Sequence, residues 1–395
     1  MLTRISNTPR DYAWGSTTLI AGLEGRAPSG RPEAEVWFGD HPGSPSEVHD
    51  GTGRTLDDWL PAEAAADDVP AKLPYLLKLL AAGAPLSIQV HPSKAQAEAG
   101  FAREEAAGVP RDAGERNYRD DNHKPEVIVA IDGDFEALAG FRPSEELAEL
   151  LGAMDLPDDA LPRLRAGLRG PDAEGAIRAA VGDLLSGRAT DAVRAIERAL
   201  VRPHAPRFAD DLAAVARIAA RHPADPGIAV ALMMNHVVLA EGEAMFVPAG
   251  VPHAYLRGLG VEIMAASDNV LRGGLTPKHV DVPELLDVID ARPGLVPRLV
   301  PEHVAPGVEL FAPPVPDFSL VRVRRDREDE PATTVRLRGA TIALATRGSL
   351  TVAGGSSELA LAPGQACLLT PDEGSVRIGG AGELFLARSG EASSD

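Results

Sequence analysis

The sequence predicts a mainly β protein that is interrupted by one block of helices. Its 34 prolines and 39 glycines supply the many turns that an all-β fold needs. Short apolar segments rich in β-branched residues occur before residue 143 and return after residue 226. Between them, apolar residues recur at helical spacing. We therefore expect β-rich segments on both sides of an inserted helical subdomain, followed by a second β domain.

Length and charge restrict the classes of protein to consider. A chain of 395 residues is expected to form two or three domains, and a hydrophobic content of 44% is ample for packed cores. The net charge of −19 would repel nucleic acid and anionic membranes over most of the surface, so an anion can bind only in a local basic pocket. We expect no nucleic-acid partner, no membrane association and a monomer.

Cysteine usage and the N-terminus indicate the compartment. Cys367 is the single cysteine, so an intramolecular disulfide and a thiolate-rich metal site are both excluded. The first sixteen residues contain no apolar segment of signal-peptide length, and no apolar run approaches the roughly 18 to 20 residues of a membrane span. We expect a soluble, cytoplasmic protein.

The first β-rich region contains three informative segments. Residues 71–91 are nearly continuously apolar and fit two buried strands, although the leucine-rich part could be helical. Lys78 within this run is either a snorkelling side chain or a charge that lines a pocket. Residues 94–121 indicate a helix and then a loop, and 127–131 a β-branched strand. His41 either faces a site or caps a turn.

The helical block begins near residue 144 and ends near 225. Its apolar residues fall at i, i+3, i+4 and i+7, and prolines interrupt the pattern. No motif in it indicates chemistry. The apolar positions are Leu147, Leu150, Leu151 and Met154, then Ile177, Val181, Leu184 and Leu185, then Val193, Ile196 and Leu200, and the breaks are Pro157, Pro162, Pro171 and Pro203.

Strand patterns return after the helical block. Residues 237–256 indicate three strands separated by glycine and Pro-Gly turns, and 280–300 carry helical and loop signals. Residues 317–390 are again rich in strands. The last histidine is His303, so a histidine-based metal centre in the final β domain is excluded.

Three candidate metal ligands lie between residues 87 and 126. Gln89 and His91 alternate with apolar residues, which is typical of a strand with its polar side chains on one face. At strand rise the two positions are about 7 Å apart along the chain. Glu126 precedes the next β-branched strand, and the best closing ligand is the distant His253.

Gly242, Pro248, Gly250 and His253 fit the pattern G-x5-P-x-G-x2-H. This resembles the second motif of the cupin superfamily, whose double-sheet β-barrels hold a metal inside the barrel. The glycines permit tight turns and the Pro-Gly corner directs the histidine inward. Arg257 occupies the position of a later asparagine in the cupin motif.

Further segments make the resemblance specific to one family. The sequences SIQVHP, NHKPE, ALAGFRP, GEAMFVPAGVPHAYL and VEIMAASDNVLRGGLTPKHVDV resemble type I phosphomannose isomerases, and YAWGS and EVWFGDHPGSPS resemble their N-terminal motifs. The similarity is close over residues 5–143 and 228–290.

The resemblance implies a cupin (jelly-roll β-barrel) catalytic domain with an inserted α-helical subdomain and a metal-free, cupin-like C-terminal domain. The expected boundaries are 1–143 and 226–300 for the catalytic domain, 144–225 for the insert and 301–395 for the C-terminal domain.

The resemblance also implies one zinc ion held by Gln89, His91, Glu126 and His253. Two nitrogen and two oxygen ligands suit a borderline divalent ion, although the sequence alone does not separate zinc from manganese or iron. Each ligand taken singly is more often a hydrogen-bonded core residue. The coincidence of all four at this spacing argues for a site.

The implied reaction interconverts mannose 6-phosphate and fructose 6-phosphate through an enediol. A base must move the proton between C2 and C1, and Lys124, Glu262 and Asp268 are equal candidates. A lysine titrates near about 10.4 and needs a nearby cation to act as a base, whereas a carboxylate is already ionised.

The remaining candidates concern the substrate. We expect Arg272 to be catalytic, because a guanidinium suits an anion or an enediolate. The predicted substrate-binding residues are Lys278, Ser87 and Lys94 for the phosphate, and Trp14 and Tyr255 for the pocket wall, where core packing is the competing interpretation.

Two other functions fit a cupin site. One is an iron oxidoreductase that uses the same ligands, and the other is a non-catalytic sugar-phosphate sensor. The presence of Lys124, Glu262, Asp268 and Arg272 beside the ligands argues against a pure binding protein, which needs no base.

Overall fold

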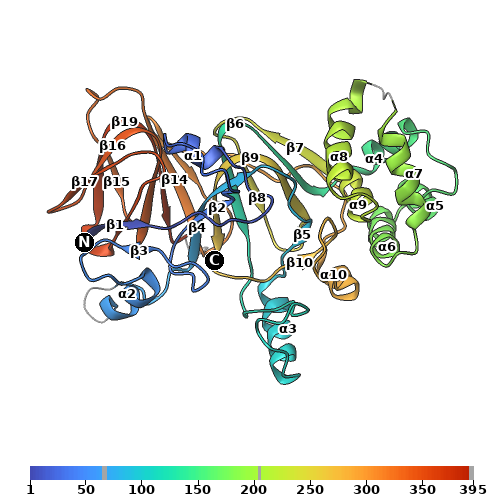
Figure 1. Ribbon diagram of the computed structural model, residues 1–395, viewed down its shortest axis with the longest axis horizontal. Helices are drawn as coiled ribbons and strands as arrows, with labels where there is room; N and C mark the ends of the chain where they lie inside the picture. The colour runs from blue at the N-terminus through green and yellow to red at the C-terminus, as the bar shows by residue number, and fades with distance from the viewer. Residues whose placement is uncertain (65–68, 203–205, 391–395) are drawn as a thin grey trace.

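The computed structural model describes residues 1–64, 69–202 and 206–390. Two antiparallel sheets lie side by side, and a block of helices covers the far end of the first sheet (Figure 1). Pro203, one of the expected breaks, lies outside the described residues. Within the described ranges, no helix is both long and apolar enough to cross a membrane. The predicted mainly β fold with a helical insert is confirmed.

The first sheet is built from segments on both sides of the helical block. Its central strands are β6 and β9, which pair with each other along most of their length. In the described chain its strands are β2 (Glu35–Phe38), β4 (Tyr75–Ala82), β5 (Gln89–Val90), β6 (Glu126–Phe141), β7 (Met234–Leu239), β8 (Ala244–Val247), β9 (His253–Ala265), β10 (Leu271–Arg272) and β11 (Arg298–Leu299).

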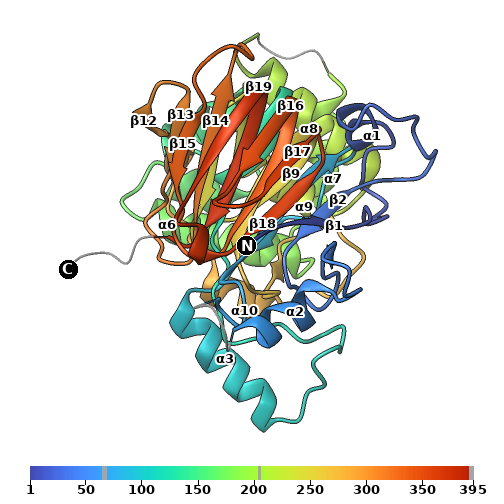
Figure 2. The ribbon, with the colours of Figure 1, turned by 90° about the vertical axis from the view of Figure 1, so that its left-hand side faces the viewer.

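The second sheet contains both the first strand of the chain and the last one (Figure 2). Its described strands are β1 (Leu2–Ser6), β3 (Glu47–Val48), β12 (Glu302–Ala305), β13 (Val308–Phe311), β14 (Ser319–Arg325), β15 (Thr333–Arg336), β16 (Thr341–Ala353), β17 (Glu358–Leu361), β18 (Ala366–Leu369) and β19 (Ser375–Arg388). β1 pairs with β18, so Leu2 lies opposite Leu369. β1 and β3 therefore belong to the sheet of the C-terminal strands, although the expected boundary at residue 143 places both of them in the catalytic domain. A strand pairs wherever its apolar face is buried, and no local pattern specifies its partner.

Helices occur in three places. Short helices flank the sheets, α3 projects below them, and α4 to α9 form the insert (Figure 1). The insert continues to residue 233, beyond the expected boundary at 225. The helices are α1 (Leu19–Leu23), α2 (Leu56–Glu63), α3 (Lys94–Ala106), α4 (Ser144–Ala153), α5 (Pro162–Gly167), α6 (Ala173–Leu185), α7 (Thr190–Leu200), α8 (Ala209–Arg221), α9 (Gly227–Met233) and α10 (Val282–Val288), with 3₁₀ turns at Pro206–Phe208 and Pro371–Glu373.

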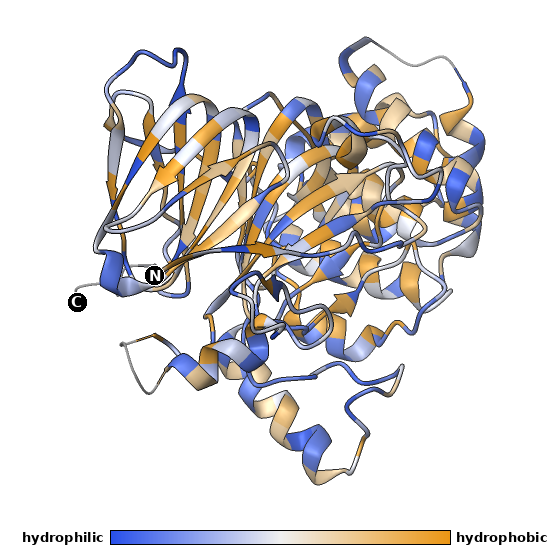
Figure 3. Cartoon of the chain, turned by 60° about the vertical axis from the view of Figure 1, so that its left-hand side comes forward, coloured by the Kyte–Doolittle hydropathy of each residue, from blue (hydrophilic) through white to orange (hydrophobic). Residues whose placement is uncertain are grey.

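Strand alternation decides which side chains face the interior of the first sheet. In β4, Leu77 and Leu79 pack into the core between the two sheets, whereas Leu80 packs into the core on the opposite face. Lys78 has the parity of Leu80 and therefore shares that face. Hydrophobic residues run along the strands of both sheets, as expected for two sheets that share a core (Figure 3). Lys78 is thus a polar residue on a largely apolar face of the first sheet.

The helical insert packs on the end of the first sheet through a continuous apolar core. α9 is buried along its whole length, and its residues join one cluster with Val90 and Leu138 of the sheet and with Ile88, which precedes β5. Burial on every side explains why α9 carries the uniformly apolar sequence GIAVALM. The insert is therefore firmly attached to the strand that carries Gln89.

Candidate metal centre and active-site pocket

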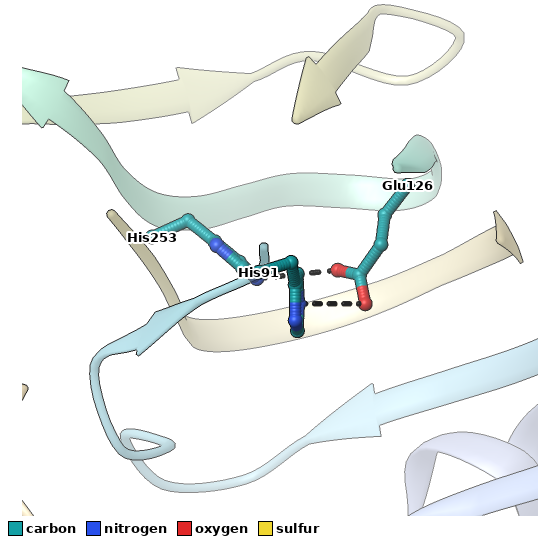
Figure 4. A group of neighbouring side chains, drawn as sticks. All are labelled: His91, Glu126 and His253. Atoms are coloured by element: carbon teal, nitrogen blue, oxygen red, sulfur yellow. Dashed lines mark ion pairs between the residues drawn. The ribbon is translucent and has the colours of Figure 1, made fainter. Parts of the chain in front are cut away.

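Three buried side chains converge inside the first sheet. His91 follows β5, Glu126 begins β6 and His253 begins β9. Their nearest ligand atoms all lie within 4.8 Å of one another (Figure 4). Glu126 Oε1 lies 3.2 Å from His91 Nε2, and Glu126 Oε2 lies 3.2 Å from His253 Nε2.

Backbone pairing brings these residues together. Gln89 on β5 lies opposite His253 on β9, and His253 also lies opposite Ala139 on β6. The Pro-Gly corner is fixed to the site because the Gly250 N–H donates to the His91 carbonyl at 2.8 Å. Gly250 has φ +82°, a left-handed conformation that glycine adopts without steric cost. Gly250 of the sequence motif thus helps to hold His91 and His253 in their positions.

Hydrogen bonds indicate that both imidazoles direct lone pairs at Glu126. His91 Nδ1 lies 2.7 Å from the Asn269 carbonyl, and His253 Nδ1 lies 3.3 Å from the Val251 carbonyl. A carbonyl only accepts, so each Nδ1 carries the proton and each Nε2 is bare. His91 Nε2 is buried and has no hydrogen-bond partner among the described residues. Two lone pairs and a carboxylate therefore face one another, which fits a divalent cation between them.

The electrostatics keep these groups in ligand form. Burial, assisted by the Lys124 charge, lowers the pKa of His91 to about 4. Burial alone would raise the pKa of Glu126, but Lys124 and the two histidines hold it well below its usual range. Lys124 Nζ lies 3.0 Å from Glu126 Oε1. Burial and the Lys124 charge therefore favour a neutral His91 imidazole beside an ionised Glu126 carboxylate.

A cavity of about 680 Å³ opens beside this centre, and a smaller cavity of about 50 Å³ adjoins the ligands. Gln89, Lys78 and Lys124 line both. These side chains therefore separate the larger cavity from the one at the metal centre, and the volume of the larger cavity accommodates a small molecule rather than a polymer.

Comparison with known proteins identifies the family. Residues 2–144 match the family model described as phosphomannose isomerase type I, catalytic domain. The chain is 38% identical to the mannose-6-phosphate isomerase of Escherichia coli K12 over 391 residues, which cover 96% of this chain and 98% of that protein. This chain belongs to the phosphomannose isomerase family. It is also 31% identical to the Bos taurus mannose-6-phosphate isomerase, over 90% of each chain.

Solved structures of the family have the same fold over the full length. A crystal structure of mannose 6-phosphate isomerase described as holo and zinc bound superposes with a TM-score of 0.87 at 33% identity, covering 99% of this chain and 100% of that one. The apo form from Salmonella typhimurium gives a TM-score of 0.86, also at 33% identity, covering 99% of each chain. This chain, which carries the His–Glu–His cluster, therefore shares its fold with a family that includes a zinc-bound member.

The structure brings most of the sequence-predicted residues to the two cavities. Tyr255 and Glu262 line the smaller one. Lys94 lines neither, because on exposed α3 its Nζ donates to the Asp121 carbonyl at 2.9 Å. The larger cavity is lined by Trp14, Ser87, Gln89, Lys124, Asp268, Arg272 and Lys278.

The candidate bases occupy different environments. Asp268 Oδ2 accepts a hydrogen bond from His41 Nε2 at 3.1 Å; burial opposes ionisation, but His41 keeps the pKa of Asp268 below its usual value. Burial raises the pKa of Glu262, against the opposing charge of Lys78, whose Nζ lies 2.9 Å from Glu262 Oε2. Asp268 is thus ionised at the larger cavity, whereas Glu262 belongs to a buried ion pair.

Sequence reasoning missed a cation in the pocket. Arg119 lines the larger cavity with Arg272 and Lys278. Burial, together with the charges of Arg272 and Arg119, lowers the pKa of Lys278, and burial and Arg119 lower that of Arg272. Among the described residues, none of the three side chains forms an ion pair with a carboxylate. Three like charges without a counter-ion fit an anionic ligand.

The helical insert also contributes to the pocket, although its sequence showed no sign of chemistry. Arg221, the last residue of α8, and His222 line the larger cavity. The only sequence signal was a basic end to an amphipathic helix, which is common for structural reasons alone. Lys78, by contrast, stood out as a charge in an apolar run, and the structure places it at both cavities.

Proposed function

We propose that this chain is a zinc-dependent isomerase that interconverts mannose 6-phosphate and fructose 6-phosphate. The observation that carries the proposal is the buried His91–Glu126–His253 cluster beside a cavity lined by Arg119, Arg272 and Lys278, which form no ion pair with a carboxylate among the described residues. Membership of the phosphomannose isomerase family supports it, because the relatives bear the name of this activity.

We propose Gln89 as the fourth ligand, beside His91, Glu126 and His253. Gln89 lies opposite His253 in the sheet, so both side chains emerge on the same face. Its amide oxygen would complete an N₂O₂ donor set, which suits zinc. When bound, zinc acts as a Lewis acid toward the sugar oxygens.

The pocket cations would bind and orient the substrate. Arg272 lies opposite Gln89 across β5 and β10, so an anion-binding group and a ligand project from adjacent positions on one face. Together with Arg119 and Lys278, the Arg272 guanidinium would hold the phosphate dianion. Ser87, Trp14 and Tyr255 would line the sugar-binding walls. We do not extend this role to Lys94, which lies outside the cavity lining.

Of the three candidate bases, Asp268 fits best. Its carboxylate is ionised, lines the larger cavity and is oriented by His41. Lys124 instead directs its ammonium at Glu126, and Glu262 is paired with Lys78. Asp268 would take the proton from C2 and return it at C1. Lys78, whose pKa is raised by Glu262 and Glu35 against the effect of burial, would stay cationic near the developing negative charge.

A coupled assay for fructose 6-phosphate tests the proposal. The zinc-loaded protein should convert mannose 6-phosphate, lose activity when a chelator removes the metal, and regain it when zinc is restored. An absence of turnover in protein with one zinc per chain would contradict the proposed function. Oxygen consumption with iron-loaded protein would support the oxidoreductase instead, and tight substrate binding without turnover would support a sensor.

Variants at the three candidate bases test the assignment. Asp268→Asn, Lys124→Met and Glu262→Gln should each keep zinc, and Asp268→Asn should lose most of kcat, by roughly 10²- to 10⁴-fold. A larger loss of kcat in either of the other two variants would move the base to that residue.

We further propose that the protein acts in the cytoplasm as a monomer, without nucleic-acid or membrane partners. We also propose that its domains follow the boundaries expected from the sequence, apart from β1, β3 and the end of the helical insert. The net charge of −19 and the single cysteine support these statements. Light scattering after gel filtration should give a mass near 41.4 kDa. A dimer would contradict the monomer.

A further inference from the structure

The last turn of the helical insert touches a loop of the first sheet. The turn joins α8 to α9, and the loop, residues 273–278, follows β10. Asp225 Oδ1 accepts the N–H of Leu275 at 3.0 Å and that of Gly227 at 2.7 Å. The two backbones are so close that a Cβ on Gly227 would lie 2.7 Å from the Leu275 nitrogen. The contact therefore needs both the carboxylate of Asp225 and a glycine at 227.

The loop has an unfavourable backbone conformation at the point of contact. Leu275 has φ +57°, a backbone conformation that residues other than glycine rarely adopt, and its side chain is only 2% exposed. Its N–H is directed at Asp225, so the hydrogen bond supports this conformation. Arg272 precedes the loop and Lys278 ends it. The conformation of Leu275 thus affects the spacing of two cations of the pocket.

The same turn carries side chains into the cavity wall. Arg221 and His222 line the cavity beside Leu275 and Lys278. His222 Nε2 is buried and has no partner in the part of the chain that the structure describes. The turn is therefore part of the pocket, not only a connection between two helices.

We infer that Asp225 is a positioning residue for anion binding, and that the helical insert serves to hold the cationic loop of the active site. The inference rests on the proposed function, in which Arg272 and Lys278 bind the substrate phosphate. Asp225 acts through Leu275 and does not touch the substrate. Its loss should weaken binding of the phosphate while leaving the metal centre and the proton transfer unchanged.

The chain offers a matched control. Glu197 of α7 accepts the N–H of Ala224 at 2.7 Å, and Ala224 also has a left-handed backbone, with φ +64°. Glu197 thus supports the same turn through the same kind of hydrogen bond. It makes no hydrogen bond to residues 273–278. Comparing Asp225→Ala with Glu197→Ala separates support of the loop from general support of the turn.

The experiment measures kcat, the KM for mannose 6-phosphate, and the inhibition constant of inorganic phosphate in the zinc-loaded protein. In Asp225→Ala, both the KM and the phosphate constant should rise about 10-fold, the effect of losing one strong hydrogen bond, with kcat within about twofold of the parent. Asp225→Asn, which keeps an acceptor oxygen, should restore most of the affinity. Glu197→Ala should leave all three constants close to those of the parent.

Gly227→Ala provides an independent perturbation if Asp225→Ala does not fold. Its Cβ should push the turn and the loop apart and raise the same two constants. The inference would be overturned if neither Asp225→Ala nor Gly227→Ala changed the KM or the phosphate constant. It would also be overturned if Glu197→Ala raised both constants equally, or if Asp225→Ala lowered kcat alone. Calorimetric titration with inorganic phosphate separates a failure of this inference from a failure of the proposed function. It measures phosphate affinity in the parent protein and in Asp225→Ala, even if the parent protein does not turn over mannose 6-phosphate.

Discussion

Asn269→Ala should weaken zinc binding from a position outside the ligand set. Asn269 is fully buried, and its carbonyl accepts the Nδ1 proton of His91 at 2.7 Å. Its side chain accepts the N–H of Arg119 at 2.7 Å and donates to the carbonyls of Asp120 and Asn122, both at 2.8 Å. One residue thus joins the orientation of a ligand to the segment that carries Arg119.

The size of the effect follows from these contacts. Three buried hydrogen bonds at about 1 kcal/mol each, with their partners left unsatisfied, give a loss of roughly 3 to 4 kcal/mol in the free energy of unfolding. The carbonyl remains in Asn269→Ala, but it is no longer held in place, and loss of such outer support typically costs 10- to 100-fold in metal affinity. We therefore expect a drop in zinc affinity of about 10-fold.

A second buried asparagine supplies the control. Asn235 donates to the carbonyls of Ala139, Phe141 and Gly294 at 3.0 to 3.2 Å, but no hydrogen bond joins it to a ligand histidine. Urea unfolding should show comparable destabilisation in Asn269→Ala and Asn235→Ala, and competition with a chromophoric chelator should show weaker zinc binding in Asn269→Ala alone. Equal zinc affinity in the two variants would refute the reasoning.

Three further predictions concern single residues. Burial raises the pKa of Cys367 to about 12, so the thiol should not react with Ellman's reagent at pH 8 until urea unfolds the protein. Because the folded protein favours the protonated thiol, this contribution to stability should be complete below about pH 9 and should be lost as the pH rises toward 12. Arg119→Ala should raise the KM for mannose 6-phosphate about 10-fold, whereas Lys94→Ala, outside the cavity lining, should leave it unchanged. His253→Ala should bind less than one zinc per chain by atomic absorption, whereas Asp268→Asn should retain a full equivalent, and loss of zinc from Asp268→Asn would show that its role is misassigned.

Gln89, His91 and His253 could be proposed as ligands from the sequence because each of them has a local signal. Gln89 and His91 alternate with apolar residues on one strand, and His253 follows a turn whose glycines need left-handed backbone. The helical insert was also predictable, because amphipathic spacing does not depend on the partner that covers the apolar face. The end of the insert was harder to predict, because α9 is buried on all sides and is as apolar as the strand that follows it.

Contacts between distant segments were not predictable in the same way. β1 pairs with β18, some 360 residues away, and nothing in Leu2–Ser6 specifies which sheet it joins. Arg119 lies in a polar loop without periodicity, and it reaches the pocket because Asn269, 150 residues away, holds its backbone. Arg221 ends an ordinary amphipathic helix. In each case, the function of the residue comes from a tertiary contact that leaves no mark on its neighbours in the sequence.

The distribution of charge in the pocket gives a physical basis for how a sugar phosphate would lie in it. Two lysines near the metal centre are neutralised locally, Lys78 by Glu262 and Lys124 by Glu126. Arg119, Arg272 and Lys278 form no ion pair with a carboxylate among the described residues. Burial and the two guanidinium groups lower the pKa of Lys278, and burial and Arg119 lower that of Arg272. In a chain of net charge −19, an unpaired cationic group is the favourable place for a dianion, whereas the paired lysines are not. The phosphate should therefore bind the unpaired group, which leaves the reacting carbons to face Asp268 and the buried ligands.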